Sequence, residues 1–145
     1  MRRVTVPPDA ETRGMLRLDA NPQAPAQARS FLRRCLSGVV RGSRLDTALL
    51  LASELVTNAV RHATPPIRVA VRVVGNLVRV EVSDSSPVLP RFRRSGPSAA
   101  SGRGLPLLAN LAQAWGADRH GSGKVVWFTV GMSRAERPAD AAGLD

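Results

Sequence analysis

Several residue types on which small proteins often depend are scarce in this chain of 145 residues. Cys35 is the only cysteine, so no intramolecular disulfide can form, and His62 and His120 are too few for a zinc site. No run approaches the roughly 20 apolar residues of a membrane span, and the first residues lack the apolar core of a signal peptide. We therefore expect a cytoplasmic protein with no membrane anchor and no thiolate or imidazole metal centre.

Acidic and aromatic residues are also few, which bears on nucleic-acid binding. Lys and Arg number 21 against 11 Asp and Glu, giving a net charge of +10, and Lys124 is the only lysine. Such a chain can bind phosphates through counterion release. The arginines are spread along the whole sequence, however, and the five aromatic residues do not lie in a basic pattern that suits base stacking. We do not expect nucleic acid as a partner.

The chain does contain enough apolar residues for one core. Hydrophobic residues make up 43% of the sequence, and one domain is expected over residues 14–131. Residues 1–13 and 132–145 are polar and are expected to be flexible termini.

Hydrophobic periodicity and turn residues predict the order of helices and strands. Asn21 is the expected cap of the first helix, with Pro22 at its first position, and Gly38 or Gly42 ends it. The predicted elements in the first part of the chain are a strand over 14–19, helices over 22–38 and 44–63, and a hairpin of strands 67–73 and 78–82. A third helix is predicted to begin with residues 105–112 and to end near Gly116, and a last strand covers 125–130. This pattern predicts an α/β protein, with helices on one face of a mixed, mostly antiparallel sheet.

A long segment without periodicity precedes a glycine motif. Residues 85–101 hold three prolines, a glycine, five serines and three arginines, and loops of this length are uncommon unless they act as lids or binding segments. Gly102-Arg103-Gly104 then begins the predicted third helix. Bare backbone amides and the positive end of a helix dipole attract phosphate, although a GxG motif alone is weak evidence.

Three polar residues are spaced four apart on the long predicted helix. Its apolar stripe contains Ala48, Ala52, Leu55, Ala59 and Ala63, and Glu54, Asn58 and His62 follow the flank of that stripe. This flank suits a ligand, but the row also fits an ordinary solvated edge. His62 lies nearest the stripe, so we interpret it first as a packed imidazole and second as a neighbour of a nucleotide.

An acidic residue occupies the apolar face of the second hairpin strand. Alternation places Asp84 on the same side as Val78, Val80 and Val82. A buried carboxylate needs a donor, and an adenine amino group would serve. The alternative is that Asp84 caps the following Ser85-Ser86-Pro87 turn. Lys124 is expected in a solvated hairpin turn rather than on a phosphate.

Together these elements resemble the GHKL ATPase superfamily, and within it the small ATP-binding domains related to bacterial anti-sigma-factor serine kinases. The resemblance covers about residues 14–131. It is carried by Glu54–Ala63, similar to the helical N box, by Val82–Pro87, where the family has its adenine-contacting aspartate, by Gly102–Leu108, similar to the second glycine box, and by Trp115-Gly116 and Gly123–Trp127, similar to the closing strands.

The resemblance implies a Bergerat-type ATP-binding fold, a two-layer α+β sandwich, with ATP and Mg²⁺ as ligands. By similarity, Asn58 ligates the Mg²⁺, Glu54 is the general base and holds the metal through water, and Asp84 accepts from the adenine amino group. Residues 85–101 become the ATP lid. The further implied ATP-binding residues are His62, Ser86, Gly102, Arg103, Gly104, Leu105 and Thr129.

One position departs from the family pattern. The usual aspartate box has glycines two and four residues after the aspartate, where this chain has Ser86 and Val88. The implied function is a homodimeric regulator of transcription that phosphorylates a serine or threonine of an anti-sigma-factor antagonist and so controls a sigma factor. The altered box keeps two alternatives open: a non-catalytic switch that responds to ATP, and a sigma-factor-binding module without nucleotide.

Overall fold

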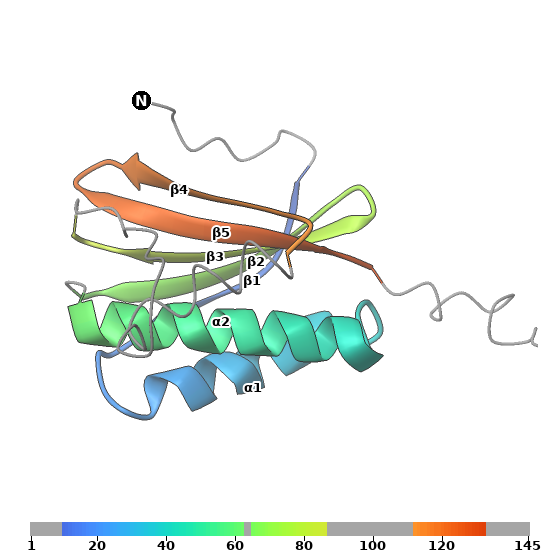
Figure 1. The fold of residues 1–145 in the computed structure, drawn as a ribbon, viewed down its shortest axis with the longest axis horizontal. Coiled ribbons are helices and arrows are strands. Elements are labelled where there is room, and N and C mark those ends of the chain that lie inside the picture. Colours follow the sequence, from blue (N-terminus) through green and yellow to red (C-terminus); the bar gives the residue numbers. More distant parts are fainter. Residues whose placement is uncertain (1–9, 63–64, 87–111, 133–145) are drawn as a thin grey trace, which may run out of the picture.

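Two helices cover one face of a five-stranded sheet in the part of the chain that the computed structural model describes, residues 10–62, 65–86 and 112–132 (Figure 1). The elements in chain order are β1 (Glu11–Leu18), α1 (Ala24–Leu36), α2 (Gly42–His62), β2 (Ile67–Val74), β3 (Leu77–Asp84), β4 (Ala114–His120) and β5 (Gly123–Gly131). The two-layer α/β prediction is confirmed. Neither described helix is long and apolar enough to cross a membrane.

The strand order is β1-β2-β3-β5-β4, and all four pairings among the described strands are antiparallel. The expectation of a mixed sheet is therefore wrong for these strands. Two of the pairs are joined by two-residue turns, which connect only antiparallel neighbours. The turn of the predicted hairpin between β2 and β3 is Gly75-Asn76, where Gly75 adopts the left-handed φ of 61° that such turns require.

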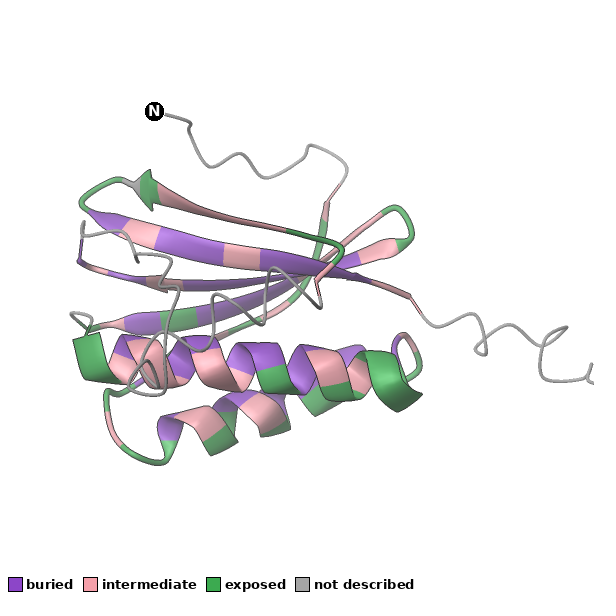
Figure 2. Ribbon diagram, viewed as in Figure 1, coloured by how far each residue is buried: buried purple, intermediate pink, exposed green. Residues whose placement is uncertain are grey.

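The core lies between the sheet and the helices. Alternate residues of the central strands point toward α1 and α2 and are fully buried, among them Val71, Val80 and Phe128. Figure 2 shows buried positions along the helix faces that meet the sheet. The predicted stripe of α2 is confirmed at Ala48, Ala52, Leu55 and Ala59, which are all buried, while Ala63 lies outside the described residues.

Two elements near the start of the chain differ from their predicted bounds. β1 begins at Glu11 rather than residue 14, because backbone pairing of Glu11 with Val73 continues the edge strand through exposed polar residues. α1 begins at Ala24, with Gln23 as its N-cap residue. The side chain of Asn21 accepts from the Gln23 amide at 2.9 Å, so Asn21 stabilises the turn before the helix rather than capping the helix itself.

The strand at the sheet edge replaces the predicted end of the third helix. Residues 114–116 were expected in a helix, but they belong to β4, which pairs with β5 from Ala114↔Thr129 to His120↔Gly123. Trp115 and Ala117 are half-buried against the core, so strand pairing together with burial outweighs the local helical pattern. The strand reading implied by the family resemblance is the one observed, and most of the predicted helix, residues 105–111, lies outside the described residues.

Candidate functional site

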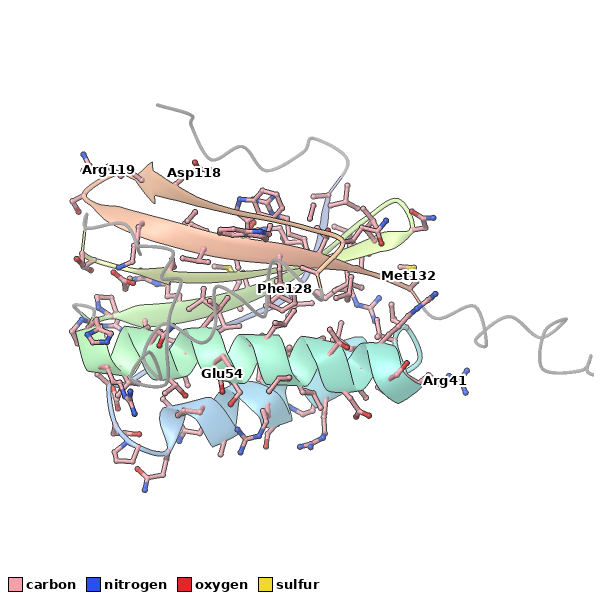
Figure 3. The ribbon with its side chains drawn as sticks, viewed as in Figure 1. Arg41, Glu54, Asp118, Arg119, Phe128 and Met132 are labelled. Atoms are coloured by element: carbon pink, nitrogen blue, oxygen red, sulfur yellow. The ribbon has the colours of Figure 1, made fainter. Side chains whose placement is uncertain are left out.

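The polar row on α2 occupies the boundary between core and solvent. Glu54 and Asn58 are half-buried, as their place beside the stripe predicted, and Figure 3 shows Glu54 midway along the helix. His62 is exposed, so its interpretation as a packed imidazole is wrong. The neighbouring turn is tied to α1, because Arg29 Nη1 donates to Ser53 Oγ at 2.8 Å. This contact links α2, which carries the polar row, to α1.

Asp84 points inward at the end of β3, as predicted. Its side chain is only 4% exposed, and it lies on the sheet face that packs against the helices. The Ser86 amide donates to Asp84 Oδ1 at 2.8 Å, which is the turn cap that the sequence left open as an alternative. Ser86 is itself buried, so these two candidate residues lie together.

The second donor to Asp84 comes from Lys124. Its Nζ lies 2.9 Å from both Asp84 Oδ1 and Oδ2, and only 11% of the lysine side chain is exposed. The expectation of a solvated Lys124 is therefore wrong. The two residues face each other in the antiparallel register of β3 and β5, and a buried carboxylate is stabilised by a hydrogen-bonded cation.

Gly123 allows this close pairing of strands. A Cβ atom at this position would overlap the carbonyl oxygen of Asp84 and would lie 3.0 Å from the Cα of Ser85. The backbones of β3 and β5 therefore approach too closely here for any side chain. The sequence does show a glycine followed by the only lysine at the start of a strand. That pattern predicts an ion pair with Asp84 only when it is known that β3 lies opposite.

The polar flank of α2 and the Asp84 pair approach the same end of the molecule. α2 and β3 run in the same direction, so the carboxyl end of each lies beside the start of β5 (Figure 1). α2 packs directly against β3 and β5. The later part of α2, which carries Asn58, therefore lies beneath the end of the sheet that carries Asp84 and Lys124.

Thr129 is not brought to this end of the sheet. It pairs with Arg79 of β3 and with Ala114 of β4, and strand alternation places it on the face opposite to Asp84 and the helices. Its hydroxyl is buried and has no hydrogen-bond partner in the described part of the chain. The structure therefore separates Thr129 from the other described candidates.

The remaining candidates fall on residues whose placement is not described. They are Gly102, Arg103, Gly104 and Leu105, together with residues 87–101 of the expected lid. Their roles stay predictions.

A shallow cavity of about 340 Å³ lies at the other end of α2. Its lining comes from the start of that helix, including Ser43 and Thr47, and from the end of β5 at Val130 and Gly131. None of the predicted site residues lines it. The cavity and the region of Asp84 therefore lie at opposite ends of α2.

A charged cluster that the sequence reading missed lies on the outer face of the sheet. Glu81 Oε2 accepts from Arg79 Nε at 2.8 Å and lies 3.3 Å from Arg72 Nε. The Arg79 guanidinium lies 4.3 Å from the centre of the Trp127 ring, a cation–π contact. These residues alternate with the core-facing positions of β2, β3 and β5. The cluster therefore stabilises the face opposite to the candidate site.

The described residues have the chemistry that an adenine nucleotide with Mg²⁺ requires. Asp84 offers a buried acceptor for a base amino group, and Glu54 and Asn58 carry the oxygen atoms that Mg²⁺ prefers. No group of three His, Cys, Asp or Glu side chains that could hold a metal occurs among the described residues. A metal held here would take part of its coordination from phosphate and water, as Mg²⁺ commonly does.

Comparisons with known proteins show the family and the fold of the chain. Residues 18–130 match the family model described as histidine kinase-like ATPase domain. Among solved structures, the crystal structure of the RsbU and RsbW domains of Rv1364c from Mycobacterium tuberculosis is similar in fold, with a TM-score of 0.63 and 24% identity. The match covers 83% of this chain and 33% of that chain, so this chain spans about a third of its length. No curated protein gives a significant match.

Proposed function

The chain belongs to the histidine kinase-like ATPase domain family, and we propose that it binds ATP with Mg²⁺ where α2 meets the end of β3. Membership of this family implies ATP binding. The observation that carries the location is the inward carboxylate of Asp84, which is 4% exposed and has its orientation fixed by the Ser86 amide. A buried acceptor held in this way selects a ligand that brings a matching donor.

Each described candidate has a distinct proposed role. Asp84 accepts a hydrogen bond from the adenine amino group, and Ser86 holds the carboxylate in position. Asn58 binds Mg²⁺ through its side-chain oxygen, and Glu54, one turn earlier, orients the attacking hydroxyl and takes its proton. Bound Mg²⁺ would neutralise phosphate charge. His62 is the last residue of α2 and of the polar row, and its exposed imidazole can approach the ligand.

The glycine motif completes the proposed site. The backbone amides of residues 102–105 bind the phosphates, and Arg103 adds its guanidinium. Residues 85–101 form the lid over the nucleotide. The support for these roles is the sequence motif and its resemblance to the second glycine box.

We further propose that the protein is a serine/threonine kinase acting on an anti-sigma-factor antagonist, and through it on a sigma factor. The support is the Glu54–Ala63 motif and the similarity of fold to the crystal structure of the RsbU and RsbW domains of Rv1364c. Phosphoryl transfer needs mainly positioning, charge neutralisation and a group that orients the nucleophile. Asn58 would hold the Mg²⁺ that neutralises the charge, and Glu54 would orient the nucleophile. We expect the kinase to act in the cytoplasm as a homodimer.

Transfer of labelled γ-phosphate to purified antagonist proteins tests the kinase. Glu54→Ala is expected to reduce the rate by at least about a hundredfold, since general bases contribute roughly that much or more. Asp46→Asn is the matched control, because it removes an exposed carboxylate from the first part of the same helix. Equal transfer by wild type and Glu54→Ala would refute the assigned role.

A non-catalytic switch that responds to ATP is the second candidate. Two observations favour it: Ser86 replaces a glycine of the aspartate box, and Lys124 already pairs with Asp84. Calorimetry with ATP and Mg²⁺ separates the kinase and the switch from a third possibility, a module that binds no nucleotide. A switch binds ATP but transfers no phosphate. A sigma-factor-binding module without nucleotide produces no heat of ATP binding, and Asn58→Ala leaves that result unchanged.

A further inference from the structure

We propose that Lys124 is a second base-reading residue, whose ammonium donates to ring nitrogen N1 of adenine while Asp84 accepts from the neighbouring amino group. This inference rests on the proposed ATP site and extends it to a residue that the resemblance did not assign. In this proposal the ion pair of Asp84 and Lys124 recognises the base through two hydrogen bonds, one accepted by Asp84 and one donated by Lys124.

The hydrogen-bonding capacity of the pair supports this role. An ionised carboxylate has about four lone-pair positions. Asp84 uses three contacts within the described residues: Oδ1 receives the Ser86 amide at 2.8 Å and Lys124 Nζ at 2.9 Å, and Oδ2 receives Lys124 Nζ at 2.9 Å. Among the described residues, an acceptor position remains on Oδ2. The ammonium has three donors, of which at most two are directed at Asp84, so toward the described residues a donor remains as well.

The burial of both side chains argues that Lys124 stays in place when a base arrives. The side chains of Asp84 and Lys124 are 4% and 11% exposed. A neutral amino group that displaced Lys124 would leave a buried carboxylate without its cation, which is strongly unfavourable. The backbone under the pair is also constrained, because Gly123 lies directly against Asp84 and Ser85. A base is therefore expected to add to the pair rather than replace one member.

Adenine fits the two positions that remain. Its hydrogen-bonding edge carries the amino group, a donor, next to N1, an acceptor, which complements an acceptor beside a donor. The contact to N1 would add affinity for the base at a site where Ser86 stands in place of a glycine.

A double comparison of protein and ligand tests this role by calorimetry. Wild type and Lys124→Met are each titrated with Mg·ATP and with Mg·1-deaza-ATP, which has carbon in place of N1. Wild type is expected to bind ATP roughly tenfold more tightly than the analogue, the value of a hydrogen bond to a charged group. Lys124→Met is expected to bind both ligands equally, because it has no donor for N1. Arg119→Met is the matched control, because Arg119 is the exposed β4 partner of Lys124, and it should keep the wild-type preference.

Each contrary result has a different meaning. If wild type binds both ligands equally, or Lys124→Met keeps the preference, Lys124 does not read N1, although ATP binding stands. Tighter ATP binding by Lys124→Met would show that the lysine competes with the base, and would overturn the inference. Failure of wild type to bind either ligand removes the proposed ATP site and this inference with it. The wild-type comparison needs no variant, so it can refute the inference even if Lys124→Met does not fold.

Discussion

Gly123→Ala is predicted to force β3 and β5 apart where the candidate site begins. The added Cβ would overlap the carbonyl oxygen of Asp84 and would lie 3.0 Å from the Asp84 carbonyl carbon and from the Ser85 Cα. All three are backbone atoms, which cannot rotate away as the end of a flexible side chain does. The strands must therefore shift, and the shift carries Lys124 away from Asp84.

The expected loss of stability combines two terms. Overpacking of a well-packed region costs about 1 to 3 kcal/mol, and distortion of the buried ion pair adds to it, so we expect a loss of about 3 kcal/mol. This is a large share of the roughly 5 to 15 kcal/mol by which such a domain is stable. Urea denaturation followed by circular dichroism measures the change in the free energy of unfolding.

Gly121→Ala provides a matched control in the adjacent turn. No atom lies within 4 Å of a Cβ at Gly121, but its φ of 62° is strained for alanine. We expect a loss of about 1 to 2 kcal/mol from that strain alone. If Gly123→Ala costs no more than Gly121→Ala, the close approach of β3 and β5 does not constrain residue 123, and the reasoning is refuted.

Two further predictions concern residues outside the candidate site. Gly116→Ala would bring a Cβ within 2.7 Å of the Trp127 ring, so the ring must shift from its present position, which includes the contact with Arg79. We expect a loss of about 1 to 2 kcal/mol and a shift in tryptophan emission, and unchanged emission and stability would contradict this. Burial raises the pKa of the Cys35 thiol from its ordinary value of 9.0, so the unfolded chain ionises first and the free energy of unfolding falls as pH rises above that value. The fall should be smaller in Cys35→Ala, and equal falls would contradict the assignment.

The features that the sequence predicted well are those with local causes. The apolar stripe of α2 and the half-buried places of Glu54 and Asn58 follow from the helical repeat within one segment. The β2–β3 hairpin follows from two alternating runs and from Gly75, whose left-handed conformation the turn requires. The inward direction of Asp84 follows from the same alternation.

The features that were missed depend on strands far apart in the sequence. Lys124 meets Asp84 only because β5 pairs with β3 across 40 positions, in a register that neither strand encodes by itself. Alternation along β5 places Thr129 on the face opposite to Lys124, and its proposed contact with ATP stays a prediction. Part of β4 was predicted as helix because its alanine and glycine residues have a low propensity for strands. Its pairing with β5 stabilises the strand in spite of that low propensity.

The central claim is that Asp84 and Asn58 hold the same Mg·ATP, Asp84 through the adenine amino group and Asn58 through the metal. A crystal structure with a non-hydrolysable ATP analogue and Mg²⁺ tests it most directly. We predict that the adenine amino group lies about 3 Å from the Asp84 carboxylate and that the Asn58 side-chain oxygen binds the metal. A nucleotide bound elsewhere, such as in the cavity at the start of α2, or a metal site without Asn58, would contradict the account.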